Sequence, residues 1–157
     1  YIQAMLEYMN INPLDNALKI YDCYWENFLS KMKLFDGVIN LIKKYQGKIC
    51  LVTDLTAHIQ YRKIKKLNLD HYINLIVSSE ECGKEKPNPN MFTLGLKKLQ
   101  LTKNDICMIG DNYDKDIYGA SSLGIKSIWL NHKKTQKFFN EDLVIEVSYF
   151  KDILHLV

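Results

Sequence analysis

Four side chains in this sequence have the chemical types and the spacing to bind a phosphate group and a divalent metal ion: Thr53, Lys86, Asp111 and Asp116. Thr53 ends an apolar run, and its hydroxyl can donate a hydrogen bond to a phosphate oxygen. Lys86 precedes Pro87, which restricts the backbone of the lysine and suits an ammonium that neutralises a phosphate or several carboxylates. A strand threonine or a loop lysine alone is an ordinary residue, so the prediction depends on their combination.

The carboxylates of this set belong to a cluster that follows a glycine. Asp111, Asp114 and Asp116 all come shortly after Gly110. Carboxylate oxygens at this density suit Mg²⁺, which binds one or two carboxylates together with water and substrate phosphate, and a glycine lets the backbone approach a ligand. Asp116 could instead cap the helix that follows, and these residues alone leave that alternative open.

The elements that must position these residues alternate between strand and helix. Apolar runs rich in β-branched residues predict strands at 48–53, 75–78, 106–109 and 127–130, with an edge strand at 143–145. Helices are predicted at 37–45 with Asp36 as its cap, and at 57–66, 88–99, 116–124 and 149–156. This alternation predicts an α/β fold with a doubly wound, Rossmann-like parallel sheet. Ligands of such sheets bind beyond the carboxyl ends of the strands, where the candidate residues lie.

Composition and charge argue against several other classes of protein. The 157 residues carry a net charge of +3, and the lysines are scattered in pairs, which argues against a nucleic-acid partner. No apolar stretch is long enough to span a membrane. The four cysteines show no CxxC spacing, so we expect reduced thiols and a cytoplasmic protein.

In their order along the chain, these motifs resemble those of the haloacid dehalogenase (HAD) superfamily, in the phosphatase branch with a helical cap. The resemblance is carried by LVTD at 51–54, KPNP at 86–89 and GDNYDKD at 110–116. It covers residues 35–157, which are therefore expected to form the core domain. Residues 1–34 are predicted to be helical and resemble the end of a cap domain.

The resemblance implies a Mg²⁺-dependent phosphatase that acts on a small phosphorylated metabolite. In this family an aspartate of a DxDx[TV] motif attacks phosphorus and forms an aspartyl-phosphate. By motif, Thr53 would hydrogen-bond the phosphoryl group, and Lys86 would neutralise the nucleophile and the phosphate. Asp111 would bind Mg²⁺, and Asp116 would support the metal or pair with Lys86. Asp54 joins the expected phosphate-binding set, but the family usually has Asn there, and a carboxylate beside phosphate is unfavourable unless a cation offsets it.

The first family motif is missing from these residues. No DxDx[TV] occurs in the chain, and no apolar strand precedes residue 48. In the family fold the missing strand lies centrally, between the strands that carry Thr53 and Asp111, and each buried backbone group left unpaired costs about 1–3 kcal/mol. We therefore expect a fragment that is inactive by itself, with a preceding segment as the partner that completes the sheet. The full-length parent is expected to be the enzyme.

Three alternatives stay open on the sequence alone. A non-catalytic, degenerate HAD domain that acts as a binding module would explain the missing nucleophile. A phosphomutase of the β-phosphoglucomutase kind shares the motifs of residues 35–157. A 2-haloacid dehalogenase shares the fold, but Gly110-Asp111 argues against it because that enzyme lacks this metal ligand.

Overall fold

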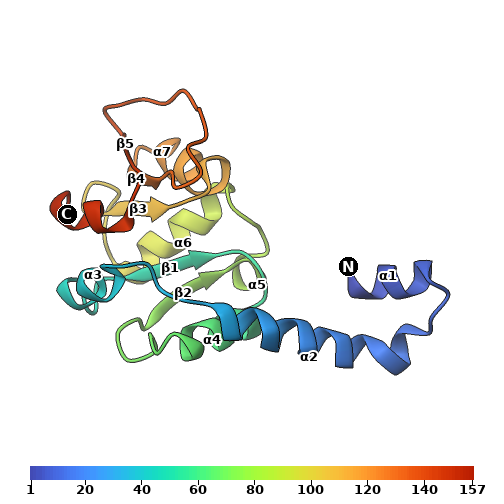
Figure 1. The fold of residues 1–157 in the computed structure, drawn as a ribbon. Coiled ribbons are helices and arrows are strands. Elements are labelled where there is room, and N and C mark those ends of the chain that lie inside the picture. The colour runs from blue at the N-terminus through green and yellow to red at the C-terminus, as the bar shows by residue number, and fades with distance from the viewer. The chain divides into compact units, whose positions relative to one another are not determined.

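The computed structural model describes all 157 residues, and these form two compact units, Tyr1–Lys33 and Leu34–Val157. The second unit contains the elements that carry the candidate site (Figure 1). In chain order they are α3 (Val38–Lys44), β1 (Cys50–Thr53), α4 (Ala57–Lys66), β2 (Leu75–Ser78), α5 (Ser79–Cys82), α6 (Pro89–Leu99), β3 (Cys107–Gly110), the π-helical η1 (Tyr113–Ile117), α7 (Tyr118–Ser121), β4 (Lys126–Leu130), β5 (Val144–Val147) and the 3-10 helix η2 (Phe150–His155). Every strand pair is parallel, so the predicted Rossmann-like α/β class is confirmed.

The first unit consists of two helices, α1 (Ile2–Tyr8) and α2 (Pro13–Lys31). α2 begins after Asn12, whose side-chain oxygen accepts a hydrogen bond from the main-chain N–H of Leu14 at 3.0 Å. Leu14 and Leu18 are 93% and 71% exposed, so α1 leaves much of the apolar face of α2 uncovered. No helix of either unit combines the length and the apolar character needed to cross a lipid bilayer. The assignment of this unit to a partial cap stays a prediction.

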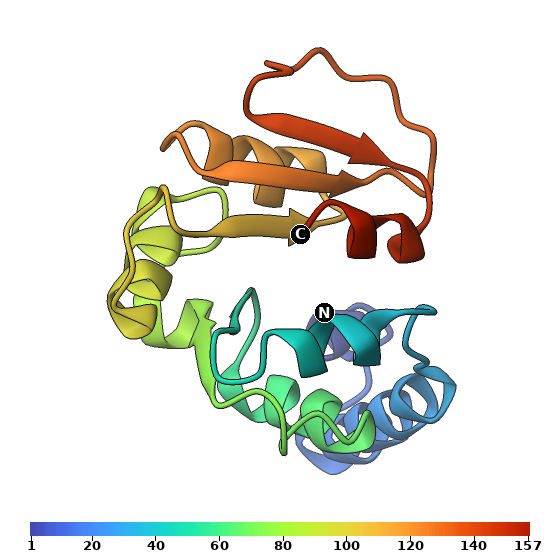
Figure 2. The ribbon, with the colours of Figure 1, turned by 90° about the vertical axis from the view of Figure 1, so that its left-hand side faces the viewer.

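The strands form two separate parallel sheets instead of one. β1 pairs with β2, with Thr53 opposite Ser78 at the carboxyl end. β4 pairs with both β3 and β5, with Gly110 opposite Trp129. β1 and β3 therefore each have a strand partner on one side only, and Figure 2 shows the break between the two sheets. The break falls where the resemblance implies a missing central strand.

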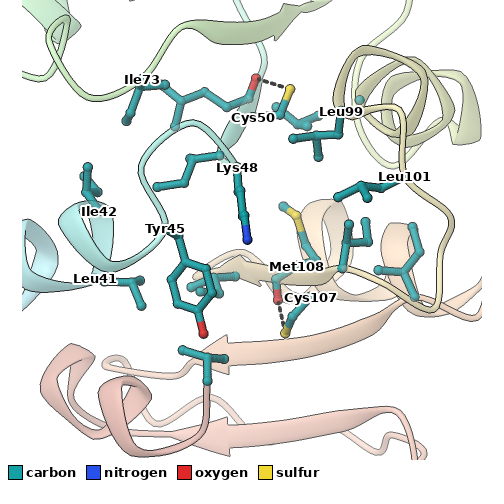
Figure 3. A pocket seen from close by; sticks show the side chains of 18 of the residues that line it. Leu41, Ile42, Tyr45, Lys48, Cys50, Ile73, Leu99, Leu101, Cys107 and Met108 are labelled. Carbon is teal, nitrogen blue, oxygen red and sulfur yellow. Dashed lines mark hydrogen bonds between the residues drawn. The ribbon is translucent and has the colours of Figure 1, made fainter.

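An apolar groove of about 740 Å³ occupies this break. Its walls are side chains of β1 and β3 together with side chains of α3 and α6 (Figure 3). Leu99 and Met108 are among the apolar residues that line it, and Cys50 and Cys107 lie on opposite walls. The groove therefore leaves apolar surface and strand edges open that a continuous sheet would bury.

The core of the second unit is divided in a similar way. Its buried apolar side chains form four clusters, although a domain of this size usually has one contiguous core. The largest cluster combines Val77 of β2 and Phe92 of α6 with Ala120 of α7. It connects the two sheets on one face, because α6 packs on β1 and β2 and also contacts α7. The packing of α6 thus holds the halves together where strand pairing does not.

Two predicted helices differ in detail from the structure. α3 begins after Gly37, and Asp36 forms no capping hydrogen bond, so the predicted Asp36 cap is wrong. Gly37 has a φ of 91°, in the left-handed region that favours glycine. A Cβ there would also lie 3.2 Å from Cδ1 of Leu154, so the glycine lets η2 pack closely. The closing helix predicted at 149–156 is present as the 3-10 helix η2.

The cysteines provide a first test of the groove geometry. Cys50 is partly buried on the groove wall, and this burial raises the pKa of its thiol to about 11. At pH 8 the fraction of Cys50 present as thiolate is roughly 200-fold below that of an ordinary cysteine. A more basic thiolate is also more nucleophilic, which offsets about tenfold of the resulting loss in reaction rate. We expect iodoacetamide to modify Cys50 about twentyfold more slowly than the exposed Cys23, measured by peptide mass spectrometry. In urea the two cysteines should react at equal rates. Equal rates of modification of Cys50 and Cys23 in the folded chain would contradict this geometry.

Candidate active site

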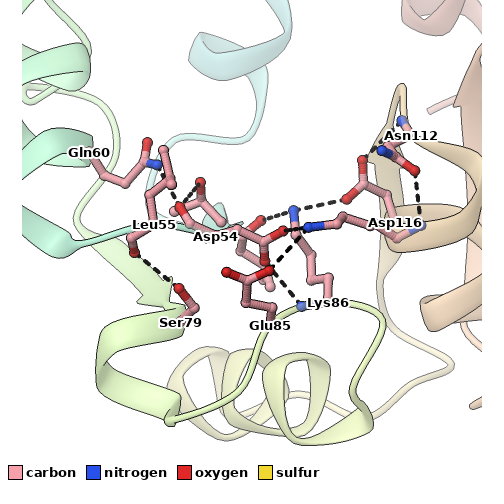
Figure 4. A network of polar contacts seen from close by, with 11 residues as sticks. Asp54, Leu55, Gln60, Ser79, Glu85, Lys86, Asn112 and Asp116 are labelled. Carbon is pink, nitrogen blue, oxygen red and sulfur yellow. Dashed lines mark hydrogen bonds and ion pairs between the residues drawn. The ribbon is translucent and has the colours of Figure 1, made fainter. Parts of the chain in front are cut away.

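Lys86 is the centre of a polar site at the carboxyl ends of the strands (Figure 4). Its Nζ lies 2.8 Å from the main-chain oxygen of Val52, near the end of β1, and 2.8 Å from Oδ1 of Asp116, beyond the end of β3. Only 11% of the Lys86 side chain and 9% of the Asp116 side chain are exposed. Two residues predicted from separate loops therefore meet, and their contact crosses the break between the sheets. The carboxyl ends of β1 and β3 accordingly lie at the same edge.

The segment after β3 holds Asp116 in this position. η1 is a single π-helical turn, a feature that is frequent at functional sites. Asn112 caps it by accepting a hydrogen bond from the main-chain N–H of Lys115 at 3.0 Å. Oδ2 of Asp116 accepts from the main-chain N–H of Asn112 at 3.2 Å, so both of its carboxylate oxygens are engaged. The alternative in which Asp116 caps the helix is wrong, because Asn112 occupies the capping position.

Gly110 leaves the room that this arrangement needs. A Cβ at this position would lie 2.5 Å from Cβ and 2.6 Å from Oδ2 of Asp116. We expect Gly110→Ala to displace Asp116 and to lower the free energy of unfolding by about 1–3 kcal/mol in urea titrations, as overpacking does. Gly95→Ala is the matched control, because its Cβ would approach Val52 at 3.3 Å and alanine adds about 1 kcal/mol of helix propensity. Equal stability of the two variants would contradict the close approach.

The end of β1 places Thr53 and Asp54 next to the Lys86 contacts. The Thr53 hydroxyl donates to the main-chain oxygen of Asp54 at 3.2 Å and forms no hydrogen bond with the other predicted site residues. Oδ1 of Asp54 accepts from the main-chain N–H of Lys86 at 3.0 Å, and Oδ2 accepts from Nζ of Lys115 at 2.8 Å. Burial alone would raise the pKa of the Asp54 carboxyl, but the hydrogen bonds and charges of the two lysines hold that pKa below its ordinary value.

Asp111 is the predicted site carboxylate that stays free to bind a metal ion. It follows β3 directly, its side chain is exposed, and only its main-chain oxygen accepts a hydrogen bond, from Nε1 of Trp129 at 3.2 Å. Asp114 instead pairs with Lys137 at 2.8 Å. No three His, Cys, Asp or Glu side chains gather as a complete metal site. A free carboxylate at this edge nevertheless fits one ligand of Mg²⁺, which takes its other oxygens from water and phosphate.

Sequence reasoning missed two residues of the site, Lys115 and Glu85. Nζ of Lys115 lies 3.2 Å from Oε2 of Glu85, in addition to its contact with Asp54. The hydrogen bond to Asp54 raises the pKa of Lys115 above its ordinary value. Burial has the opposite effect, and the hydrogen bond to Glu85 adds to the rise. The only sequence signal for Lys115 was its place beside Asp116 in the loop after a strand. Such a lysine is ordinarily solvated, and nothing local indicates a partner far along the chain.

The fold and the site together define a class of protein. It is a Rossmann-like α/β domain that gathers a lysine and carboxylates at the carboxyl edge of parallel strands. The chain belongs to the haloacid dehalogenase-like hydrolase family, whose model matches residues 2–130. The family resemblance of the sequence is thereby confirmed.

Individual relatives agree with this membership. The chain is 34% identical over 132 residues to the ribulose-1,5-bisphosphate 5-phosphatase of Halopiger xanaduensis. The matched region covers 82% of this chain and 55% of that protein. The chain is also 35% identical over 141 residues to the glyceraldehyde 3-phosphate phosphatase of Methanopyrus kandleri. That matched region covers 85% of this chain and 60% of the relative. A similar fold occurs in the crystal structure of the putative HAD-hydrolase YfnB from Bacillus subtilis bound to magnesium. The TM-score is 0.73 at 23% identity, and the match covers 85% of this chain and 60% of that chain. The chain thus spans a little over half the length of these proteins.

Proposed function

We propose that this chain is part of a Mg²⁺-dependent phosphatase that hydrolyses a small phosphorylated metabolite through an aspartyl-phosphate. The observation that carries the proposal is the meeting of Lys86 with Asp116 and the end of β1 at one edge of the strands, with Asp111 free at the end of β3. Two relatives named as phosphatases of small phosphorylated compounds support the reaction, and the magnesium of YfnB supports the metal. The four free cysteines support a cytoplasmic location.

Each side chain has a role that follows from its contacts. Lys86 uses two acceptors for its ammonium and keeps a third N–H for a phosphoryl oxygen. Asp116 holds that ammonium in place, and the Thr53 hydroxyl can rotate from the Asp54 main chain to donate to phosphate. Asp111 would hold Mg²⁺, which when bound neutralises charge on the phosphoryl group.

The nucleophile is proposed to come from a strand that fills the groove between β1 and β3. Both strands end at the same edge, so a strand parallel to both would reach its carboxyl end beside Lys86. Its backbone would pair with the two free strand edges, and its side chains would cover the apolar groove walls. A DxDx[TV] strand has this character and is absent from residues 1–157.

Metal dependence tests the role of Asp111. In an active longer polypeptide that contains residues 1–157, we expect EDTA to abolish hydrolysis of p-nitrophenyl phosphate and added Mg²⁺ to restore it. Asp111→Asn should raise the Mg²⁺ concentration for half-maximal activity at least about tenfold. Asp114→Asn is the matched control and should shift it less than about twofold, because this carboxylate forms an exposed pair with Lys137. Equal shifts in the two variants would count against the assignment.

A further inference from the structure

Asp54 and Lys115 form an ion pair that links the two halves of the site. Oδ2 of Asp54, at the end of β1, lies 2.8 Å from Nζ of Lys115, which belongs to η1 beyond β3. The Asp54 side chain is 17% exposed and the Lys115 side chain is 41% exposed. The same ammonium lies 3.2 Å from Oε2 of Glu85, in the loop between α5 and α6. Lys115 therefore joins three segments that lie beyond β1, β2 and β3 in the chain.

The Asp54 carboxylate also holds the main chain of Lys86. Its Oδ1 accepts from the N–H of Lys86 at 3.0 Å, while Nζ of Lys86 returns to the main-chain oxygen of Val52 at 2.8 Å. Both ends of this lysine are thus attached to the last part of β1. Lys115 contacts the other oxygen of the same carboxylate from the far side of the break, so one side chain holds Lys86 through one oxygen and meets Lys115 through the other.

The contacts of Asp54 argue against a direct bond from this residue to phosphate. An ionised carboxylate only accepts hydrogen bonds, and each oxygen of Asp54 already accepts from a donor. An unpaired carboxylate at this edge would repel a phosphate dianion. Lys115 offsets that charge through a direct contact and need not touch the phosphate itself.

We propose that Asp54 and Lys115 form a pair with divided roles: an acceptor oxygen of the Asp54 side chain positions Lys86, and Lys115 cancels the negative charge that Asp54 would otherwise bring to the phosphate site. This inference rests on the proposed phosphatase function and deepens it. It makes the two residues a unit, because loss of the lysine is harmful only while the carboxylate stays.

The test compares Lys115→Met, Asp54→Asn and the double variant in the active longer polypeptide. Lys115→Met should weaken inhibition by inorganic phosphate and lower kcat/KM for p-nitrophenyl phosphate about tenfold, because the carboxylate is left uncompensated. Asp54→Asn and the double variant should both stay within about threefold of wild type, since asparagine still accepts from the Lys86 N–H. The matched control is the exposed pair of Lys137 with Asp114 of η1. Lys137→Met, alone or combined with Asp114→Asn, should change both values less than about twofold.

Recovery in the double variant is the result that a merely structural lysine would not give. A double variant as impaired as Lys115→Met would overturn the pair, and so would a Lys115→Met loss no greater than that of the Lys137→Met control. If the wild-type polypeptide has no phosphatase activity, the proposed function fails, and thermal unfolding then judges the pair separately. Lys115→Met should lower the midpoint by about 2–4 °C, and adding Asp54→Asn should restore it. Additive losses in that cycle would overturn the pair on their own.

Discussion

A longer polypeptide in which a DxDx[TV] strand precedes residues 1–157 is expected to hydrolyse p-nitrophenyl phosphate with Mg²⁺ at least about 10³-fold faster than residues 1–157 alone. The shorter chain retains Lys86 and Asp111, which could still polarise a phosphate, so trace turnover is compatible with the account. It lacks the covalent nucleophile, however, and members of a catalytic unit act together. Its strands also leave the groove between β1 and β3 open.

The comparison uses residues 1–157 with and without a preceding DxDx[TV] strand, and each length has an Asp111→Asn control. Robust turnover by the shorter chain, abolished by its own Asp111→Asn substitution, would show that the nucleophile lies within residues 1–157. An inactive longer polypeptide that contains the motif would favour the non-catalytic binding module instead.

Lys86→Met is expected to lower kcat/KM of the longer polypeptide about 10²–10³-fold, because it removes a preorganised cation from the place where phosphoryl charge develops. The lysine is held from two sides, by the main-chain oxygen of Val52 and by Asp116, each at 2.8 Å. No other ammonium takes the same place, since Lys115 is engaged by Asp54 and Glu85. Steady-state kinetics with p-nitrophenyl phosphate measure the loss.

A stability control separates this loss from unfolding. Lys86→Met leaves the nearly buried Asp116 carboxylate without its partner, which costs about 3–5 kcal/mol when a buried pair is broken. The double variant Lys86→Met with Asp116→Asn removes the stranded charge. It should recover much of the free energy of unfolding in urea without recovering turnover. If either variant keeps the wild-type kcat/KM, Lys86 has no role in the reaction.

The contact between Lys86 and Asp116 could be predicted from the sequence, because parallel strands bring their carboxyl ends to one edge and residues of separate loops meet there. The same rule placed Thr53 and Asp111 at that edge. The choice between two roles for Asp116 needed the structure, since the Lys86 contact and the Asn112 cap depend on the π-helical turn of η1.

Other features depended on geometry that a single sequence does not reveal. The contact between Asp54 and Lys115 joins residues far apart in the chain, and each residue alone is ordinary. The N-terminal cap of α3 is Gly37, in the left-handed conformation, and not the neighbouring Asp36. The break between β1 and β3 matches the missing motif, but the groove that occupies it and the bridging role of α6 emerge only from packing.

The most direct measurement of the central claim is the site of covalent phosphorylation. The longer polypeptide is mixed with a phosphorylated substrate and Mg²⁺, quenched in acid during turnover, digested and examined by mass spectrometry. We expect one phosphoryl group on the first aspartate of the DxDx[TV] strand, and no such adduct when that aspartate is replaced by asparagine. A phosphoryl group on any residue of 1–157, or rapid turnover without any phosphorylated residue, would contradict the central claim.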